Sequence, residues 1–183
     1  MAALFTAYSL SGAAGIRNSW VMLVVAWSVH FGYLHPPASL EWVGSWWLIL
    51  LAVAGSIVEF FGDKVPALDH ALHVLHMGLA PLVGALAAMS GYQGDGAVEV
   101  ILGVLGGANA LVIHSARSGV RAVSSATTVG MANPVISILE DIAATVFIIV
   151  ALFAPLLTAA LLVMATIWMI KKARGLWTRR QTA

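Results

Sequence analysis

Apolar segments near the length of a membrane-spanning helix divide almost the whole chain. A hydrocarbon core about 30 Å thick needs about 20 apolar residues in a helix to cross it. Four such segments are separated by short polar or proline-containing stretches, at residues 18–34, 41–61, 66–90 and 97–114. A fifth apolar run, at 135–170, is longer than one span. The sequence therefore predicts an all-α, polytopic helical membrane protein, with residues 1–172 as a single transmembrane domain.

Charged residues are too scarce to build a water-soluble surface. Only 9% of the chain is Asp, Glu, Lys or Arg, whereas soluble proteins carry about 25%. The absence of cysteine excludes a disulfide framework, a thiol nucleophile and a thiolate metal site. We therefore expect the lipid bilayer to be the main partner of the chain, and we expect no binding to nucleic acid.

The number of spans depends on how the run 135–170 is divided. As one straight helix it would be about 54 Å long, well beyond the hydrocarbon core. Either Pro155 separates two short spans, or residues 135–142 lie outside one kinked helix. Six spans with a cytoplasmic C-terminus place all nine Lys and Arg residues on the inner side, as the positive-inside rule favours. We expect six transmembrane helices in the cell inner membrane, with five as the alternative.

Three further segments lie outside these spans. Residues 1–16 contain no charge and lack the basic start of a cleavable signal peptide, so we expect an interfacial or re-entrant segment. Residues 115–134 are too polar for a span and too apolar for an ordinary loop, and they are a second candidate for re-entrant structure. Residues 173–183 form a basic tail that we expect on the cytoplasmic side.

Most charges outside the tail fall into two groups, and Arg17 stands apart from both. The first group begins with Glu59 and Asp63, which lie four residues apart and so share a helix face. The turn Gly62–Pro66 then folds the end of one span against the start of the next, with Lys64 as the nearest counter-charge. Ionisable residues within a membrane cost free energy unless they are paired or hydrated, so they mark a candidate site. The candidate binding residues of this group are Glu59, Asp63, Lys64, Asp69, His70, His73 and His76.

The second group lies between residues 114 and 141. Arg117 and Arg121 share a helix face with His114 if that helix continues. Pro134 suits the first turn of the next helix, with Asn133 as its cap. The candidate binding residues of this group are Arg117, Arg121, Asn133, Glu140 and Asp141. We predict an ion pair that joins one acid, Glu59 or Glu140, to one of the two arginines.

Each group has a structural as well as a functional interpretation. The charged side chains can form structural salt bridges or lie at the hydrated interface, and the histidines can be polar residues on a helix face that points into the bundle. The functional alternative is a divalent-metal or proton site. Asp69, His73 and His76 follow one another at one-turn spacing, and Asp and His are ligands for hard or borderline cations.

The two groups together resemble a bacterial membrane family catalogued as domain of unknown function 4126. The resemblance rests on Glu59-x-x-x-Asp63-Lys64-x-Pro66-x-x-Asp69-His70, on Arg121, and on Asn133-Pro134-x-x-Ser137-x-x-Glu140-Asp141. It extends from about Ser9 to the last span. It implies a small inner-membrane protein whose motif positions are Glu59, Asp63, Lys64, Pro66, Asp69, Asn133, Pro134, Glu140 and Asp141. The family commonly has an acid where this chain has His73.

Three functional hypotheses follow. The leading one is a small transporter or channel-like permease, because carboxylates and bases at membrane depth need a water-filled or ligand-filled cavity. Its substrate would be a cation or proton if the acids dominate, and an anionic headgroup or metabolite if Arg117 and Arg121 dominate. The second is a membrane-embedded enzyme with a divalent metal ion, although no G-x-S-x-G, H-E-x-x-H or P-loop pattern is present. The third is a lipid-organising or assembly protein whose basic tail binds anionic lipid.

The size of the chain also suggests self-association. Six short helices barely enclose a solvated path, so we expect a homo-oligomer. The pattern Gly103-x-x-x-Gly107 permits close helix packing and offers one candidate interface.

Overall fold

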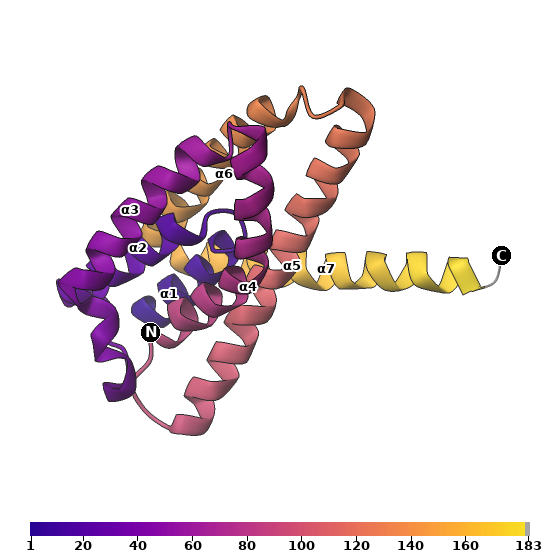
Figure 1. Ribbon diagram of the computed structural model, residues 1–183. Coiled ribbons are helices and arrows are strands. Elements are labelled where there is room, and N and C mark those ends of the chain that lie inside the picture. Colours follow the sequence, from indigo (N-terminus) through magenta and orange to yellow (C-terminus); the bar gives the residue numbers. More distant parts are fainter. Residues whose placement is uncertain (182–183) are drawn as a thin grey trace.

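The computed structural model describes residues 1–181, except for the side chains of residues 66–67, 69–71, 170 and 173–181. This part of the chain is helical throughout, apart from its turns and links, which confirms the all-α prediction (Figure 1). The elements in chain order are α1 (Ala2–Ala13), α2 (Asn18–His30), the 3₁₀ helix η1 (Ala38–Gly44), α3 (Trp46–Gly62), α4 (Pro66–Met89), α5 (Gly96–Thr128), α6 (Asn133–Phe153) and α7 (Pro155–Gln181).

Three of these helices are long and apolar enough to cross a membrane. They are α5, α6 and the part of α4 from Leu72 to Met89. The pair η1 and α3, bent by 55° at the break between them, supplies a fourth if it counts as one span. The part of α7 from Pro155 to Met169 is a shorter apolar helix. Many large apolar side chains on these helices are exposed, as a lipid-facing surface requires.

The short helix α1 lies inside the bundle rather than on its surface. It packs against α4, α5, α6 and α7, and its second half is buried. Small residues make this possible: a Cβ atom on Gly12 would lie 2.6 Å from a methyl carbon of Leu162 on α7. Residues 1–16 therefore belong to the helix core of the protein.

The helix α5 is longer than the sequence suggests. It continues through the polar residues after His114 and ends at Thr128, where Val129 and Gly130 adopt positive φ angles of 54° and 82°. Residues 115–128, which are more polar than the preceding span, therefore continue its helix. Arg117, Arg121 and Ser124 lie on the buried face of this stretch, whereas Ser115, Ser125 and Thr127 are exposed.

The start of α6 differs from the prediction in one respect. Pro134 lies in its first turn, as predicted, but the residue before the helix is Ala132, and Asn133 is its first residue. The Asn133 side chain accepts a hydrogen bond from Ser124 at 2.9 Å and donates one to Ser125 at 3.1 Å. Asn133 therefore ties α6 back to α5 instead of capping its own helix.

The break predicted at Pro155 is confirmed, because α6 ends at Phe153 and α7 begins at Pro155. After the break α7 runs past α1, and its C-terminal part extends away from the other helices (Figure 1).

The helices α4 and α5 form the most extensive pair, and glycines bring their backbones together. A Cβ atom on Gly84 would lie 2.5 Å from the carbonyl oxygen of Gly106. Gly103 and Gly107 are buried against Met89 and Pro81 of α4. The close packing predicted for these two glycines is confirmed, and since α4 occupies their face, they offer no surface to a second copy of the chain.

Candidate functional site

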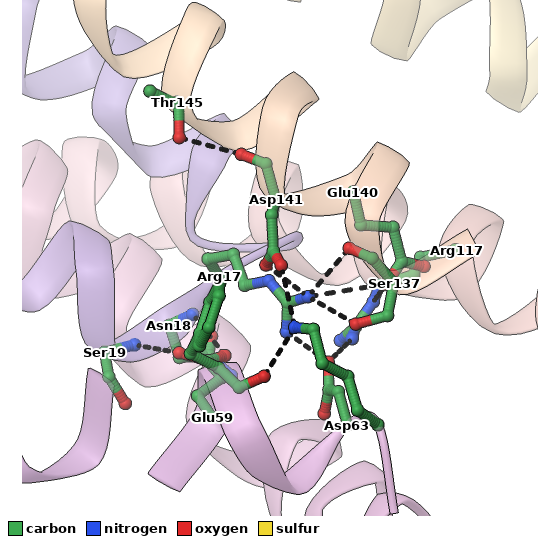
Figure 2. Close-up of polar contacts among 12 residues, drawn as sticks. Arg17, Asn18, Ser19, Glu59, Asp63, Arg117, Ser137, Glu140, Asp141 and Thr145 are labelled. Carbon is green, nitrogen blue, oxygen red and sulfur yellow. Dashed lines mark hydrogen bonds and ion pairs between the residues drawn. The ribbon is translucent and has the colours of Figure 1, made fainter. Parts of the chain in front are cut away.

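Arg17, in the link between α1 and α2, lies at the centre of a buried network of ion pairs (Figure 2). Its side chain is fully buried. Nη1 pairs with the carboxylate of Asp63, and Nη2 lies 2.6 Å from Oδ1 of Asp141. Nη2 also donates to the Oγ atom of Ser137 at 3.2 Å and to its carbonyl oxygen at 3.3 Å. One guanidinium thus joins the link after α1 to the end of α3 and the first turns of α6.

Close packing before Arg17 explains how it reaches this position. A Cβ atom on Gly15 would lie 2.4 Å from the carbonyl oxygen of Ala110, so the chain after α1 touches the backbone of α5. Arg17 itself has an extended backbone, with φ −136° and ψ 96°. The link therefore passes through the interior, and its one charged side chain points into the bundle.

The sequence interpretation that Arg17 stands apart is wrong, because it treats residues 1–16 as separate from the bundle. A count of acids and bases in the sequence could have indicated that Arg17 pairs with these acids. Without Arg17, the two groups hold five acids against three bases. Arg17 is the remaining base before the basic tail, and a buried base needs an acid. The acids are Glu59, Asp63, Asp69, Glu140 and Asp141, and the bases are Lys64, Arg117 and Arg121.

Two arginines of α5 complete the network. Arg121 holds Glu140 with two donors, Nη2 at 2.6 Å from Oε2 and Nε at 3.1 Å from Oε1. The Nε atom of Arg117 lies 3.0 Å from Oε2 of the same carboxylate. The predicted ion pair between Glu140 and these arginines is confirmed. These contacts tie α5 to α6 across the turn that joins them.

Asp63 is the central anion of the network. Its Oδ2 atom pairs with Arg17, lies 2.7 Å from Nη2 of Arg117, and lies 3.4 Å from Nη2 of Arg121. Asp63 belongs to the turn after α3, outside the candidate spans. Burial alone would raise the pKa of this carboxyl, but the positive charges of Arg17 and Arg117 outweigh burial and lower the pKa below its ordinary value. Asp63 therefore stays ionised at neutral pH.

Lys64 occupies the edge of the network, where its side chain is 25% exposed. Its Nζ atom donates to Asp141 at 3.1 Å and to the carbonyl oxygen of Phe60 at 2.6 Å, and it lies 3.7 Å from the centroid of the Phe60 ring. The predicted counter-charge of the first group thus pairs with an acid of the second group.

Glu59 follows a different pattern from the other acids. It accepts hydrogen bonds from the backbone N–H groups of Asn18 at 3.1 Å and Ser19 at 3.0 Å, as Figure 2 shows. These are orphan donors at the start of α2, where the helix dipole favours a negative charge. Among the described side chains Glu59 has no ion pair with Arg or Lys. Of the two acids that the prediction offered for an ion pair with Arg117 or Arg121, Glu140 forms it, and Glu59 instead accepts from the backbone of α2.

The described histidines of α4 and α5 contact Glu59 and one another. His76 is buried, with Nε2 at 3.4 Å from Oε1 of Glu59. His73 stacks on His114 of α5, with ring centroids 5.3 Å apart. The predicted site residues Asp69 and His70 have side chains outside the described part of the structure.

The described side chains include no group of three His, Asp or Glu residues placed to hold a metal ion. The predicted ligand set of Asp69, His73 and His76 includes one residue outside that part, so it stays a prediction.

A cavity of about 540 Å³ opens beside the network. It lies between the start of α4, the polar half of α5 and the start of α6. Two further acids of the network pair with the cations that line this cavity: Asp141 pairs with Lys64, and Glu140 pairs with Arg121. The polar and charged side chains that line it are Asp63, Lys64, His73, Ser118, Arg121, Ser125 and Asn133.

The position of Lys64 predicts a small effect on stability. We expect Lys64→Gln to lower the free energy of unfolding by about 1 kcal/mol or less, because a partly exposed ion pair is weak and Asp141 keeps its bond to Arg17. Thermal unfolding in detergent micelles measures this change. A loss of about 3 kcal/mol, typical of a broken buried pair, would contradict the peripheral role of Lys64.

The comparison with known protein families matches nearly the whole chain. Residues 4–174 match the family described as "Domain of unknown function (DUF4126)". No curated protein and no solved structure matches the chain. The matched region contains the whole buried network and nearly all of the helices described above. The chain therefore belongs to this family, whose function is unknown.

Proposed function

We propose that the chain is a small multi-pass permease that moves a small anion through the cavity beside the ion-pair network. The observation that carries the proposal is the cavity itself, which brings two cationic side chains together with hydroxyl and amide groups among apolar helices. Its volume of about 540 Å³ suits a small molecule. Polar side chains in a cavity among apolar helices are costly unless water or a solute covers them.

The lining favours an anion over a cation. Lys64 and Arg121 carry positive charge, and Asp63 is the one acid among the described lining residues. The Oδ2 atom of Asp63 also faces three guanidinium groups, which leaves it little capacity to bind a cation. Ser118 and Ser125 add hydroxyl groups that can donate to an oxyanion.

Exchange of ion-pair partners supplies a mechanism for opening the site. A carboxylate or phosphate in the cavity competes with Glu140 for the donors of Arg121. Release of Glu140 weakens the connection between α5 and α6, so solute binding favours a conformation in which these helices separate. A ligand shifts a conformational equilibrium by its difference in affinity for the two states. The ion pairs therefore act as the gate.

The proposal includes a topology of six spans in the inner membrane. It counts α2 and the apolar part of α7 as short spans beside α3, α4, α5 and α6. The C-terminus then lies in the cytoplasm together with all nine Lys and Arg residues, which is what the positive-inside rule supports. The link before α2 also lies on that side, and its Arg17 meets the other charges of the network.

Uptake by proteoliposomes tests the proposal. Purified protein is reconstituted and offered labelled phosphate, sulfate, acetate and succinate, and each rate is compared with that of protein-free vesicles. We expect uptake of at least one anion, and we expect Arg121→Gln to reduce it about tenfold or more, because a buried charge-assisted contact is worth about 1.5–3 kcal/mol.

A matched control uses a charge distant from the cavity. Lys171→Gln removes an exposed base of α7 and is expected to leave uptake unchanged. Wild-type uptake equal to that of empty vesicles for all four anions would contradict the permease. Equal loss in both variants would contradict the role given to Arg121.

A further inference from the structure

A second set of ionisable side chains lies deeper than the anion cavity and takes no part in the ion-pair network. Glu59, His76 and His114 are buried, with 1%, 3% and 2% of their surface exposed. Glu59 has no Lys or Arg within ion-pair distance among the described side chains; its carboxylate contacts the two N–H groups of α2 and His76, and the guanidinium groups of Arg17 and Arg117 lie farther away.

The histidines connect Glu59 to the cavity. His73 lines the cavity and stacks on His114, with ring planes inclined by 23°. His76 follows His73 by three residues on α4, so the two lie on neighbouring turns of one face. His76 in turn contacts Glu59 at 3.4 Å. Imidazole rings thus lead from the cavity wall to a buried carboxylate.

Nδ1 of His76 has no hydrogen-bond partner in the described part of the structure. No described side chain forms a hydrogen bond with the ring nitrogens of His114, which lies near the backbone of Gly15. A buried polar group without a partner costs about 1–3 kcal/mol, and such groups are exceptional in native proteins. An imidazole nitrogen can accept or donate a proton near neutral pH. These atoms are therefore suited to pass a proton between neighbours.

We propose that His73, His114, His76 and Glu59 form a proton-binding array, in which one proton from the cavity is taken up by the Glu59–His76 pair. The pair changes from a carboxylate beside a neutral imidazole to the same pair with one added proton, held between Oε1 of Glu59 and Nε2 of His76, with a net gain of one positive charge. The array gives the permease the proton as its coupling ion. That coupling rests on the proposed function, whereas the uptake of the proton does not.

The surrounding charges make the array sensitive to the state of the network. The charged groups nearest His76 include the Arg17 and Arg117 guanidinium groups and the Asp63 carboxylate. His114 stacks on His73 and lies near the Arg117 guanidinium and the Glu140 carboxylate. When an anion enters the cavity, its negative charge adds to the groups that favour a proton. Anion and proton then bind together.

A difference titration of the purified protein tests the uptake. Wild type and Glu59→Gln are titrated in lipid nanodiscs between about pH 8 and pH 5, where an unperturbed His titrates, and protons bound per chain are counted. The glutamine side chain keeps a carbonyl oxygen for the N–H groups of Asn18 or Ser19, so the fold is retained. We expect wild type to bind about one proton more than the variant, because the amide removes one of the two groups that share the proton.

Two comparisons make the result decisive. Gly78→Ala changes no ionisable group and meets no neighbouring atom, so it should bind as many protons as wild type and serves as the control. His114→Phe should keep the proton count and slow proton uptake after a pH jump at least tenfold. Identical titration curves for wild type and Glu59→Gln would overturn the proton site, and an unchanged uptake rate in His114→Phe would overturn the path through His114.

The coupling is tested separately from the site. Uptake of the transported anion is expected to rise at least fivefold when the outside is made acidic, and to lose this dependence in Glu59→Gln. A wild-type rate of anion uptake that is the same with and without the pH gradient would overturn the coupling. If no anion is taken up but wild type still binds one proton more than Glu59→Gln, the permease proposal is contradicted and the proton-site proposal is supported.

Discussion

Replacement of Arg17 by Gln is expected to destabilise the protein by about 3–5 kcal/mol, the range for breaking a buried ion pair from one side. Asp63 and Asp141 both contact the Arg17 guanidinium, and both are buried. Glutamine keeps some hydrogen-bonding capacity but no charge, so two carboxylates lose their shared cation. We expect most of the variant to be lost as aggregate during purification.

Fluorescence-detected size-exclusion chromatography and thermal unfolding in detergent measure this loss. Arg17→Lys is the informative companion, because an ammonium keeps the charge and cannot span both carboxylates and Ser137 as the planar guanidinium does. We expect its unfolding temperature to lie between those of wild type and Arg17→Gln. Lys171→Gln, which removes an exposed base, should behave as wild type. Wild-type stability of Arg17→Gln would contradict the central role of the network.

The second large effect is expected at the crossing of α4 and α5. A Cβ atom on Gly84 would lie 2.5 Å from both the carbonyl oxygen of Gly106 and the Cβ atom of Ala110. The backbone cannot move away without separating the two helices, so Gly84→Ala should cost about 3 kcal/mol and Gly84→Val more. Thermal unfolding of the purified variants measures the change.

The same helix offers a matched control for this substitution. A Cβ atom on Gly78 would meet nothing within 4 Å, so Gly78→Ala adds the same methyl group without a collision. Alanine has the higher helix propensity, and we expect a neutral effect or a gain of up to about 1 kcal/mol. If Gly84→Ala were as stable as Gly78→Ala, the close approach of α4 and α5 would be contradicted.

The sequence alone predicts the class of protein and most members of the network. Scarce charge and apolar segments indicate a membrane protein, and the charges that remain are functional or structural candidates because burial makes them costly. Glu140 pairs with Arg117 and Arg121 as predicted, since these residues lie on two helices joined by one short turn.

Contacts between distant segments could not be predicted from spacing. Arg17 meets Asp63 and Asp141, from segments far apart along the chain, only because α1 lies inside the bundle. Glu59 prefers the backbone of α2, and no periodicity in the sequence shows which helix end will face a given carboxylate. Small and hydroxyl-bearing residues in α1 are compatible with a surface segment as well as with tight packing.

The interior position of α1 has a consequence for how the protein is made. This helix precedes in the chain all four helices that enclose it, α4, α5, α6 and α7. During synthesis the arginine that follows α1 emerges well before its acids, and Asp141 emerges after most of the chain. The first helix can therefore reach its final packing only after the four later helices have been inserted. Domains usually fold from the N-terminus during synthesis, whereas here the N-terminal helix packs last.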